Sequence, residues 1–247
     1  MAVCANAVIT AGGRIDGAFA AAAGTSIKAL APLHGTTSLA RVIAAARGAG
    51  AQRIAVVGDA AVRDACEHDV DRVIADTGSG EGNVVAALRA WPQDEPLLYL
   101  TSDMPYIQAV HIVGLMDCIK ENTFAMPVVS LAQYRQRFPD APPAGIALRD
   151  GAIVNGGLFV MPAGASSHIE AVAMRFFAAR KSPLAMARLV GLPFLVSYLF
   201  RRLTLAGIEG RAQSILRMPV MALRDAAAEL AFDIDDASHY AYACAHK

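Results

Sequence analysis

One strand-like, apolar stretch of the sequence ends in a carboxylate. Residues 96–102 read PLLYLTS, and Asp103 follows directly, ahead of Met104 and Pro105. Aspartate suits helix caps and turns, which gives Asp103 a purely structural interpretation. A carboxylate at the edge of a sheet can also bind Mg²⁺, which prefers oxygen ligands and retains water and phosphate oxygens. The local sequence leaves both interpretations open.

A second acidic cluster lies near the C-terminal end, where residues 231–243 read AFDIDDASHYAYA. Asp233 and Asp235 alternate with apolar residues, so their carboxylates lie on the same side if the segment is a strand. Asp236 is then a candidate cap for a terminal helix. The alternative is a solvated acidic strand end followed by that cap.

Two glycine-containing loops are candidate phosphate sites. Gly12 and Gly13 follow the strand-like residues 5–10, and Lys28 comes fifteen residues after Gly13. Glycines let backbone N–H groups approach phosphate oxygens, and a lysine neutralises the charge. The spacing is neither GxxxxGK[ST] nor GxGxxG, and a tight turn is the structural alternative.

The second loop, in DTGSGEGNVVAAL, contains Gly78, Gly80 and Gly82 between a strand and a helix. With Asp103 following about 20 residues later, it supports an alternative function, that of an NAD(P)-dependent oxidoreductase. The spacing is GxGxG, however, and the loop follows the third predicted strand rather than the first.

The elements that must position these residues alternate along the first half of the chain. Near-continuous apolar strands separated by amphipathic helices indicate an α/β fold with a mostly parallel sheet covered on both faces. Ligands of such sheets bind beyond the carboxyl ends of the strands, where Asp103 lies. The predicted strands are 5–10, 53–58, 71–76, 96–102 and 123–130, and the predicted helices are 36–50, 59–68, 82–91 and 108–120.

The second half is less regular. Residues 145–163 predict a hairpin turning at Asp150-Gly151 and a further strand, 219–224 another strand, and 236–246 a terminal helix. We expect one domain over 1–247, with a nucleotide-binding half (1–130), an acceptor-binding half (131–247) and a helical insertion at about 164–216.

Length and composition exclude several classes of protein. With 247 residues, 55% hydrophobic, the chain is not of the disordered class. Lys plus Arg (22) balance Asp plus Glu (22), so no net charge favours nucleic acid. Four scattered cysteines and an opening without a basic region predict a cytoplasmic protein. The longest apolar run, 189–200, is shorter than the roughly 20 residues that span a bilayer.

Taken in order, six motifs resemble the MobA-like nucleotidyltransferases, the family of molybdenum-cofactor guanylyltransferase and sugar-phosphate nucleotidyltransferases. They are AVITAGG, KALAPLHGTTSLARVIAAARGAGAQRIAVVG, GSGEGNVVAAL, TSDMP, NGGLFV and FDIDDASHYA. The resemblance implies a three-layer α/β/α fold with a mixed, Rossmann-like sheet. It also implies Mg²⁺-dependent transfer of a nucleoside monophosphate from a triphosphate to a phosphorylated acceptor, with release of pyrophosphate. A non-catalytic nucleotide-binding protein of the same fold is the other alternative.

The resemblance also assigns roles to residues. Lys28, Asp103 and Asp235 are the implied catalytic residues, and the two aspartates are the implied Mg²⁺ ligands, with Asp233 an alternative to Asp235. The family's GxGxRM is absent, so Arg14 stands in for its phosphate-binding arginine, and the loop to Lys28 is longer. The implied nucleotide-binding residues are Ala11, Gly12, Gly13, Arg14, Lys28, Asp76, Gly78, Gly80, Gly82 and Asn83, and the acceptor-facing ones are Asn155, Gly156 and Gly157.

Residues 164–216 combine a long apolar surface with several basic residues. The simplest interpretation is a helical subdomain packed on the sheet with its charges solvated. A second is an acceptor pocket in which Arg180 and Lys181 bind phosphate and the apolar helices admit a lipid-like acceptor or touch a membrane. A homodimer interface is a third.

Overall fold

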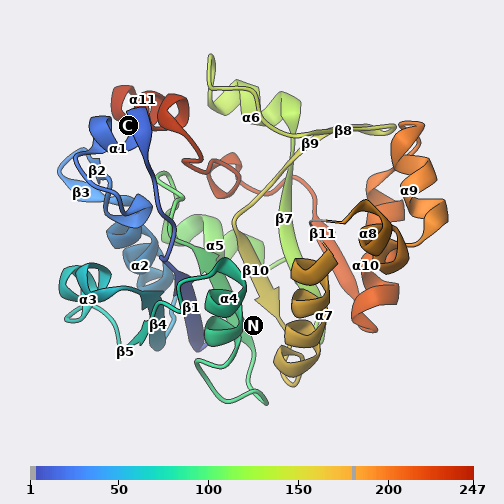
Figure 1. Cartoon of the computed structure of the whole chain (residues 1–247), viewed down its shortest axis with the longest axis horizontal. Coiled ribbons are helices and arrows are strands. Elements are labelled where there is room, and N and C mark those ends of the chain that lie inside the picture. The colour runs from blue at the N-terminus through green and yellow to red at the C-terminus, as the bar shows by residue number, and fades with distance from the viewer. Residues whose placement is uncertain (1–3, 180–181) are drawn as a thin grey trace.

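A mixed β-sheet runs through the centre of the molecule (Figure 1). The computed structural model describes residues 4–179 and 182–247. The strand order in the described part is β5-β4-β1-β6-β10-β7-β9-β8, and β11 pairs with β7. The strands are β1 (Asn6–Thr10), β4 (Arg53–Gly58), β5 (Arg72–Ala75), β6 (Leu97–Thr101), β7 (Phe124–Ser130), β8 (Ile146–Leu148), β9 (Gly151–Asn155), β10 (Leu158–Met161) and β11 (Val220–Leu223).

The first four strands of the sheet, β5, β4, β1 and β6, are mutually parallel, as predicted. Val8 of β1 pairs with Ala55 of β4 and with Tyr99 of β6, and all three side chains lie on one face of the sheet. Ile9, the next residue of β1, faces the opposite core. Both faces are therefore buried, which explains why these strands are almost entirely apolar.

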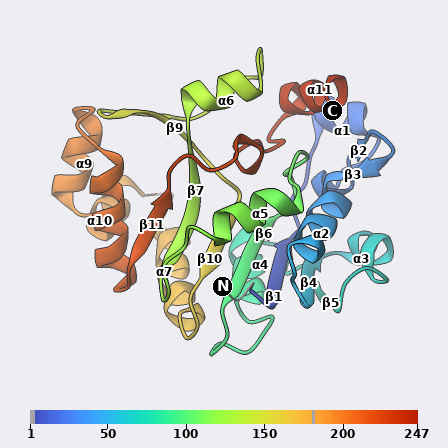
Figure 2. The ribbon, with the colours of Figure 1, turned by 180° about the vertical axis from the view of Figure 1, so that it is seen from behind.

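Helices cover the two faces. In Figure 1, α4 (Gly80–Leu88) and α7 (Ser166–Ala179) lie in front of the sheet. Figure 2 shows the opposite face, covered by α2 (Ser38–Gly48) and α5 (Ala109–Met116), with α3 (Ala60–Cys66) beside them. The predicted three-layer α/β/α fold is confirmed. Sequence signals set the helix starts: Thr37 caps α2, and Asp59 caps α3.

The strands of the second half of the chain bring antiparallel pairs into the sheet. β10 runs antiparallel to both β6 and β7, and β8 and β9 form the predicted hairpin. The turn comes one residue earlier than expected: Arg149 and Asp150 form it, and Gly151, at φ 124°, begins β9. Only glycine adopts such a φ without strain, so Gly151 fixes the place of the turn.

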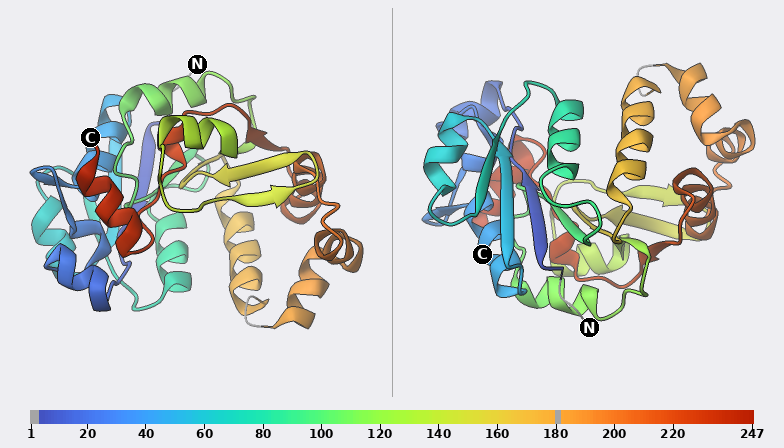
Figure 3. Two further views of the ribbon diagram at one scale, coloured as in Figure 1. Left: turned by 90° about the horizontal axis from the view of Figure 1, so that it is seen from above. Right: turned by 90° about the horizontal axis from the view of Figure 1, so that it is seen from below.

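Four consecutive helices follow β10, as the sequence predicts for this region. They are α7, α8 (Pro183–Val190), α9 (Leu192–Leu199) and α10 (Leu205–Leu216). In Figure 3, α8 and α9 project away from the sheet. Within the described residues, no helix combines the length and the apolar character needed to cross a membrane. Arg180 and Lys181, the predicted phosphate-binding pair, lie outside the described residues.

An aromatic cluster fastens the C-terminal segment to the rest of the chain. Phe232 is fully buried and packs against Tyr106, Phe138 and Tyr242, with ring centroids 5.0, 4.9 and 5.6 Å away. The cluster lies between α1 (Gly17–Ala23), α6 (Leu131–Arg137), the short helix η2 (Ala228–Leu230) and α11 (Ala237–Ala245). The strand that was the condition for aligning Asp233 and Asp235 does not form: residues 231–236 form no ladder and are held by this packing instead.

Candidate active site

The glycine turn after β1 holds Lys28 beside it through the backbone. Gly13 O accepts a hydrogen bond from Lys28 N over 3.0 Å, and Ile15 N donates to Ser26 O, also over 3.0 Å. An isolated bridge between Arg14 and Ile27 completes this short antiparallel contact. The helix α1 occupies the longer loop noted in the sequence. The chain thus returns to the glycine turn at Lys28, fifteen residues after Gly13.

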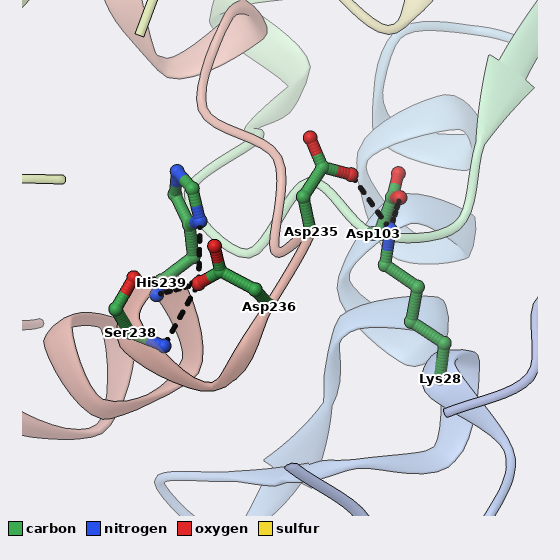
Figure 4. Close-up of polar contacts among 6 residues, drawn as sticks. All are labelled: Lys28, Asp103, Asp235, Asp236, Ser238 and His239. Atoms are coloured by element: carbon green, nitrogen blue, oxygen red, sulfur yellow. Dashed lines mark hydrogen bonds and ion pairs between the residues drawn. The ribbon is translucent and has the colours of Figure 1, made fainter. Parts of the chain in front are cut away.

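Lys28 joins the two predicted aspartates. Its Nζ lies 2.5 Å from Asp103 Oδ2 and 3.0 Å from Asp235 Oδ1 (Figure 4). The Lys28 side chain is only 16% exposed, whereas that of Asp235 is 70% exposed. Burial opposes the charge of Lys28, but the ion pairs and hydrogen bonds with Asp103 and Asp235 outweigh it, and the pKa of Lys28 is raised. The ammonium group therefore stays charged.

Backbone hydrogen bonds carry Asp235 to this place. Ile234 N donates to Asp103 O over 3.0 Å, so the acidic segment is attached to the end of β6. Gly157 N donates to Leu230 O over 3.1 Å, and Gly157 O in turn accepts from Thr101 N over 2.9 Å. A Cβ at Gly157 would overlap Thr101 Oγ1 and lie 3.1 Å from Asp233 Oδ1. The NGG motif thus acts through the close approach of its backbone.

Asp233 is the third carboxylate of the cluster. Burial raises its pKa well above the usual range, and the nearby charges of Asp103 and Asp235 add to this, while Lys28 opposes it. Asp233 Oδ1 and Asp103 Oδ1 are buried and have no hydrogen-bond partner among the described residues. Asp103 and Asp235 flank a single ammonium group, so the cluster keeps an excess of negative charge even when Asp233 is protonated.

A cavity of about 580 Å³ opens on one side of Lys28. It runs from the glycine turn to the end of β6 and is bordered by the loop before α4. Its lining includes most of the predicted nucleotide-binding residues: Gly12, Gly13, Arg14, Lys28, Asp76, Gly78, Gly80 and Asn83, together with Asp103.

Asp76 and Asn83 build the rim of this cavity. Asp76 Oδ1 accepts from Gly78 N over 2.9 Å and from Asn83 Nδ2 over 2.8 Å, and Asn83 Oδ1 accepts from Thr77 N over 2.9 Å. A Cβ at Gly12 would overlap the Asn83 amide, so the turn and the rim fit only with glycine there. Gly82 donates its N–H to Ser79 Oγ at the start of α4, so its nucleotide role stays a prediction.

Two predicted nucleotide-binding residues have other partners. Ala11 is fully buried, and its N–H donates to Val57 O over 2.8 Å. Arg14 lines the cavity but pairs with Asp59 over 2.6 Å at an exposed site. Their nucleotide roles stay predictions.

A second cavity, of about 310 Å³, lies on the other side of Asp235. The predicted acceptor residue Asn155 lines it, and Asp233 and Asp235 form part of its wall. Sequence reasoning missed Tyr134 and His239, which also line it. The sequence SHYA after the acidic motif places His239 one helical turn from Asp236, whose carboxylate it contacts over 2.9 Å (Figure 4).

The donor set agrees with a divalent cation that shares its shell with a ligand. No group of three or more His, Cys, Asp or Glu arranged to hold a metal occurs in the described ranges, 4–179 and 182–247. Asp103 keeps a buried, unpartnered oxygen, however, and Asp235 is open to solvent. Mg²⁺ is commonly bound by one or two carboxylates plus substrate phosphates rather than by a complete protein cage. The residues present fit that mode of binding.

Comparison with known proteins agrees with the site. The sequence matches the family model described as MobA-like NTP transferase domain over residues 7–226. The chain belongs to this family. This MobA-like NTP transferase is thus an enzyme of the nucleotidyltransferase class, which favours the nucleotide interpretation of the glycine loops over the oxidoreductase alternative. No curated protein matches the sequence.

Solved structures show the same fold. A hypothetical transferase from Thermus thermophilus is 30% identical, covers 94% of this chain and 96% of its own, and superposes with a TM-score of 0.80. Rv0371c from Mycobacterium tuberculosis H37Rv, solved with manganese, is 15% identical; the match covers 98% of this chain and 98% of that one, with a TM-score of 0.55. CTP:phosphocholine cytidylyltransferase from Streptococcus pneumoniae is 11% identical; the match covers 97% of this chain and 97% of that one, with a TM-score of 0.55. At such identities the last two support the fold alone.

Proposed function

We propose that this MobA-like NTP transferase transfers a nucleoside monophosphate from a triphosphate to a phosphorylated acceptor and releases pyrophosphate. One observation carries the proposal: the Lys28 ammonium group lines the larger cavity and pairs with Asp235, which lines the smaller one. A donor in the first cavity and an acceptor in the second would meet at Lys28. This assignment agrees with the predicted nucleotide-binding and acceptor-binding halves, which remain a prediction.

The larger cavity suits the nucleotide. Its volume, about 580 Å³, is within the range of small-ligand sites. Gly12 and Gly13 present backbone rather than side chains to it, so phosphate oxygens can approach closely. The Asp76–Asn83 rim borders the ribose and base in this arrangement. Four free cysteines are compatible with a reducing cytoplasm, where we place the reaction.

Asp103 and Asp235 are the proposed ligands of Mg²⁺, with Asp233, whose Oδ1 is buried and unpartnered among the described residues, as the alternative to Asp235. When bound, the ion would neutralise phosphate charge and act as a Lewis acid on the α-phosphate. Lys28 supplies a fixed positive charge at the same place, held by Asp103. Such preorganised charge stabilises the negative charge that develops in phosphoryl-type transfer.

The transfer itself needs no covalent enzyme intermediate. An oxygen of the acceptor phosphate forms a bond to the α-phosphorus, and the bond from that phosphorus to the bridging oxygen of the β-phosphate breaks. Pyrophosphate leaves with the bonding electron pair, and the acceptor phosphate enters already ionised, so no proton has to be removed. Lys28 offsets the repulsion between the two anions as they approach.

The lining of the smaller cavity indicates which chemical groups the acceptor has besides its phosphate. Its polar lining comprises carboxylates, an amide, a phenol and an imidazole, from Asp233, Asp235, Asn155, Tyr134 and His239. These groups bind hydroxyl or ammonium groups better than phosphate. We therefore place the acceptor phosphate at Lys28 and its hydroxyl or amino groups in this cavity. Arg180 and Lys181 remain proposed phosphate contacts.

A lipid-like acceptor is the second candidate, and Phe177 favours it. This residue lines the larger cavity and belongs to α7, the first of the helices in the apolar region 164–216. An acceptor with an apolar tail could lie along that segment while its phosphate reaches Lys28.

The test is a pyrophosphate-release screen of the four ribonucleoside triphosphates, with Mg²⁺ or Mn²⁺, against phosphorylated sugars, phosphorylated amino alcohols and lipid phosphates. The manganese complex and the CTP-dependent relative make Mn²⁺ and CTP the first conditions to test. We expect one triphosphate and one acceptor class to give release that EDTA abolishes. Triphosphate binding without release across the whole panel would support the non-catalytic alternative instead.

A further inference from the structure

The helix α9 is apolar except for Ser197, yet none of its residues is fully buried. Its sequence, LPFLVSYL, has no charged residue. Leu199, at its end, is 67% exposed, and Phe200, which follows, is 69% exposed. A helix that is apolar on all sides normally lies in a protein core or in lipid. Because α9 lies on the surface, its side chains mark an interaction site.

The sequence around α9 carries positive charge alone. Between positions 171 and 208 there are six arginine or lysine residues and no aspartate or glutamate. The whole chain is balanced, with 22 basic and 22 acidic residues, so this segment is a strongly basic part of a neutral protein. The exposed basic residues in the described part of the segment are Arg175, Arg188, Arg201 and Arg202.

We propose that α8 and α9 bind the surface of a membrane that contains anionic lipids. The exposed side chains of Leu192, Tyr198, Leu199 and Phe200 would enter the boundary between headgroups and acyl chains. The flanking arginines would contact lipid phosphates, to which a cluster of basic residues is attracted. The projection of this pair of helices from the body of the molecule leaves room for such contact (Figure 3).

The positive charge around α9 argues against binding of a second copy of the chain to this surface. A two-fold symmetric dimer through α9 would set the same basic surface against itself. Opposed arginines without acidic partners repel each other, whereas an anionic bilayer supplies the missing negative charge. The proposal does not depend on the transfer reaction, because it rests on α8 and α9 rather than on the cluster around Lys28.

Co-sedimentation with vesicles tests it. We expect the protein to pellet with phosphatidylcholine vesicles containing about one third phosphatidylglycerol at low salt, and not with pure phosphatidylcholine. High salt should release it, since screening weakens the arginine contacts. Arg201→Gln with Arg202→Gln should lower the partition coefficient about 30-fold. Leu199→Ser with Phe200→Ser should lower it at least about tenfold.

The matched control is Val110→Ser with Val113→Ser, which removes exposed apolar side chains from α5 on another part of the surface. This control should pellet like the wild type. As a second readout, Phe200→Trp fluorescence should shift to the blue with anionic vesicles, and Val110→Trp fluorescence should not. No pelleting with anionic vesicles at low salt would overturn the proposal. So would a dimer, seen by analytical ultracentrifugation, that Leu199→Ser with Phe200→Ser dissociates.

Discussion

The backbone N–H of Ile234 donates a hydrogen bond to the carbonyl oxygen of Asp103 over 3.0 Å. This single contact joins the end of β6 to a residue 131 positions further along the chain. It sets the Asp235 carboxylate beside the Lys28–Asp103 ion pair. The site is therefore assembled by tertiary structure, and each of its parts can be tested separately.

Removing any of the three charges should reduce turnover strongly. We expect Asp103→Asn, Asp235→Asn and Lys28→Ala each to lower the rate of pyrophosphate release by at least about a hundredfold, because preorganised charge carries the reaction. Release is measured at saturating triphosphate with the acceptor that the screen identifies. Unchanged release in Asp103→Asn and Lys28→Ala would refute the site assignment.

The neighbouring Asp236 provides the control for Asp235. Its Oδ1 accepts from Ser238 N over 2.8 Å and from His239 N over 3.0 Å, and so caps α11 (Figure 4). Asparagine is an equally good cap, so Asp236→Asn should keep both fold and turnover, within about threefold. A loss of activity in Asp236→Asn as large as in Asp235→Asn would show that charge in this segment acts without regard to position.

Gly12→Ala should weaken nucleotide binding. The added Cβ would overlap the Asn83 amide and lie 3.2 Å from Asp76 Oδ1, so the rim of the cavity has to move. We expect KM for the triphosphate to rise about tenfold or more, with a smaller change in kcat, because a displaced rim costs binding in the ground state and the transition state alike. Gly114→Ala in α5 is the control, since its Cβ would meet nothing within 4 Å. Equal KM values in both variants would contradict this role of Gly12.

Phe232→Ala should destabilise the whole fold. Phe232 is fully buried in the aromatic cluster, and truncation of such a residue costs about 3–5 kcal/mol. For a chain of this size we expect the midpoint of thermal unfolding to fall by roughly 10 °C in scanning calorimetry. Phe200→Ala, at a position 69% exposed, should leave the midpoint nearly unchanged. A similar loss in both would show that burial at Phe232 is not what stabilises the segment.

Glu229 should make stability depend on pH. It pairs with Arg137 over 2.5 Å. Burial raises the pKa of Glu229, but the hydrogen bond from Arg137 and smaller contributions outweigh it, so the pKa is lowered overall. The ionised carboxylate therefore contributes stability above the pKa of the unfolded chain, about 4.3, and this contribution is lost as pH falls through the lower folded value.

Urea denaturation at several pH values checks this expectation. Glu229→Gln should unfold about 1 kcal/mol more easily at pH 7, and the difference from the wild type should shrink below about pH 4. Arg224→Gln serves as a control on a neighbouring surface, because its exposed pair with Glu209, at 3.6 Å, contributes little. A difference between wild type and Glu229→Gln that is the same at pH 3 and pH 7 would rule out the ion pair as its cause.

Local signals were sufficient for the parallel half of the fold. The apolar run 53–58 became β4 with the same bounds, and the side chains of Thr37 and Asp59 cap α2 and α3 at their starts. Asp103 could be placed because a buried strand must end at the edge of the sheet where ligands bind. These features depend on the spacing of apolar residues and on the residues at turns, both of which can be recognised within a few positions of the sequence.

Other features depend on contacts between distant residues. The alanine-rich stretch 17–23 gave no distinct signal, and α1 forms because Phe19 packs on Tyr240 of α11, with ring centroids 5.2 Å apart. Alternation around Asp233 is compatible with a strand, but the segment has no ladder partner and is fixed by Phe232 and by the hydrogen bond to Asp103 O. Tyr134 and His239 enter the smaller cavity from separate helices, which spacing cannot reveal.

The backbone contact between Arg14 and Ile27 joins the two ends of the loop that carries α1. Residues inserted at the exposed Gly24, just after α1, should therefore leave the Lys28 ammonium group in place. Loop closure costs little more as a loop lengthens. Deletion of α1 would instead remove Phe19 and Ala23 from the aromatic cluster, so a peptide tag belongs at Gly24 and not in place of the helix.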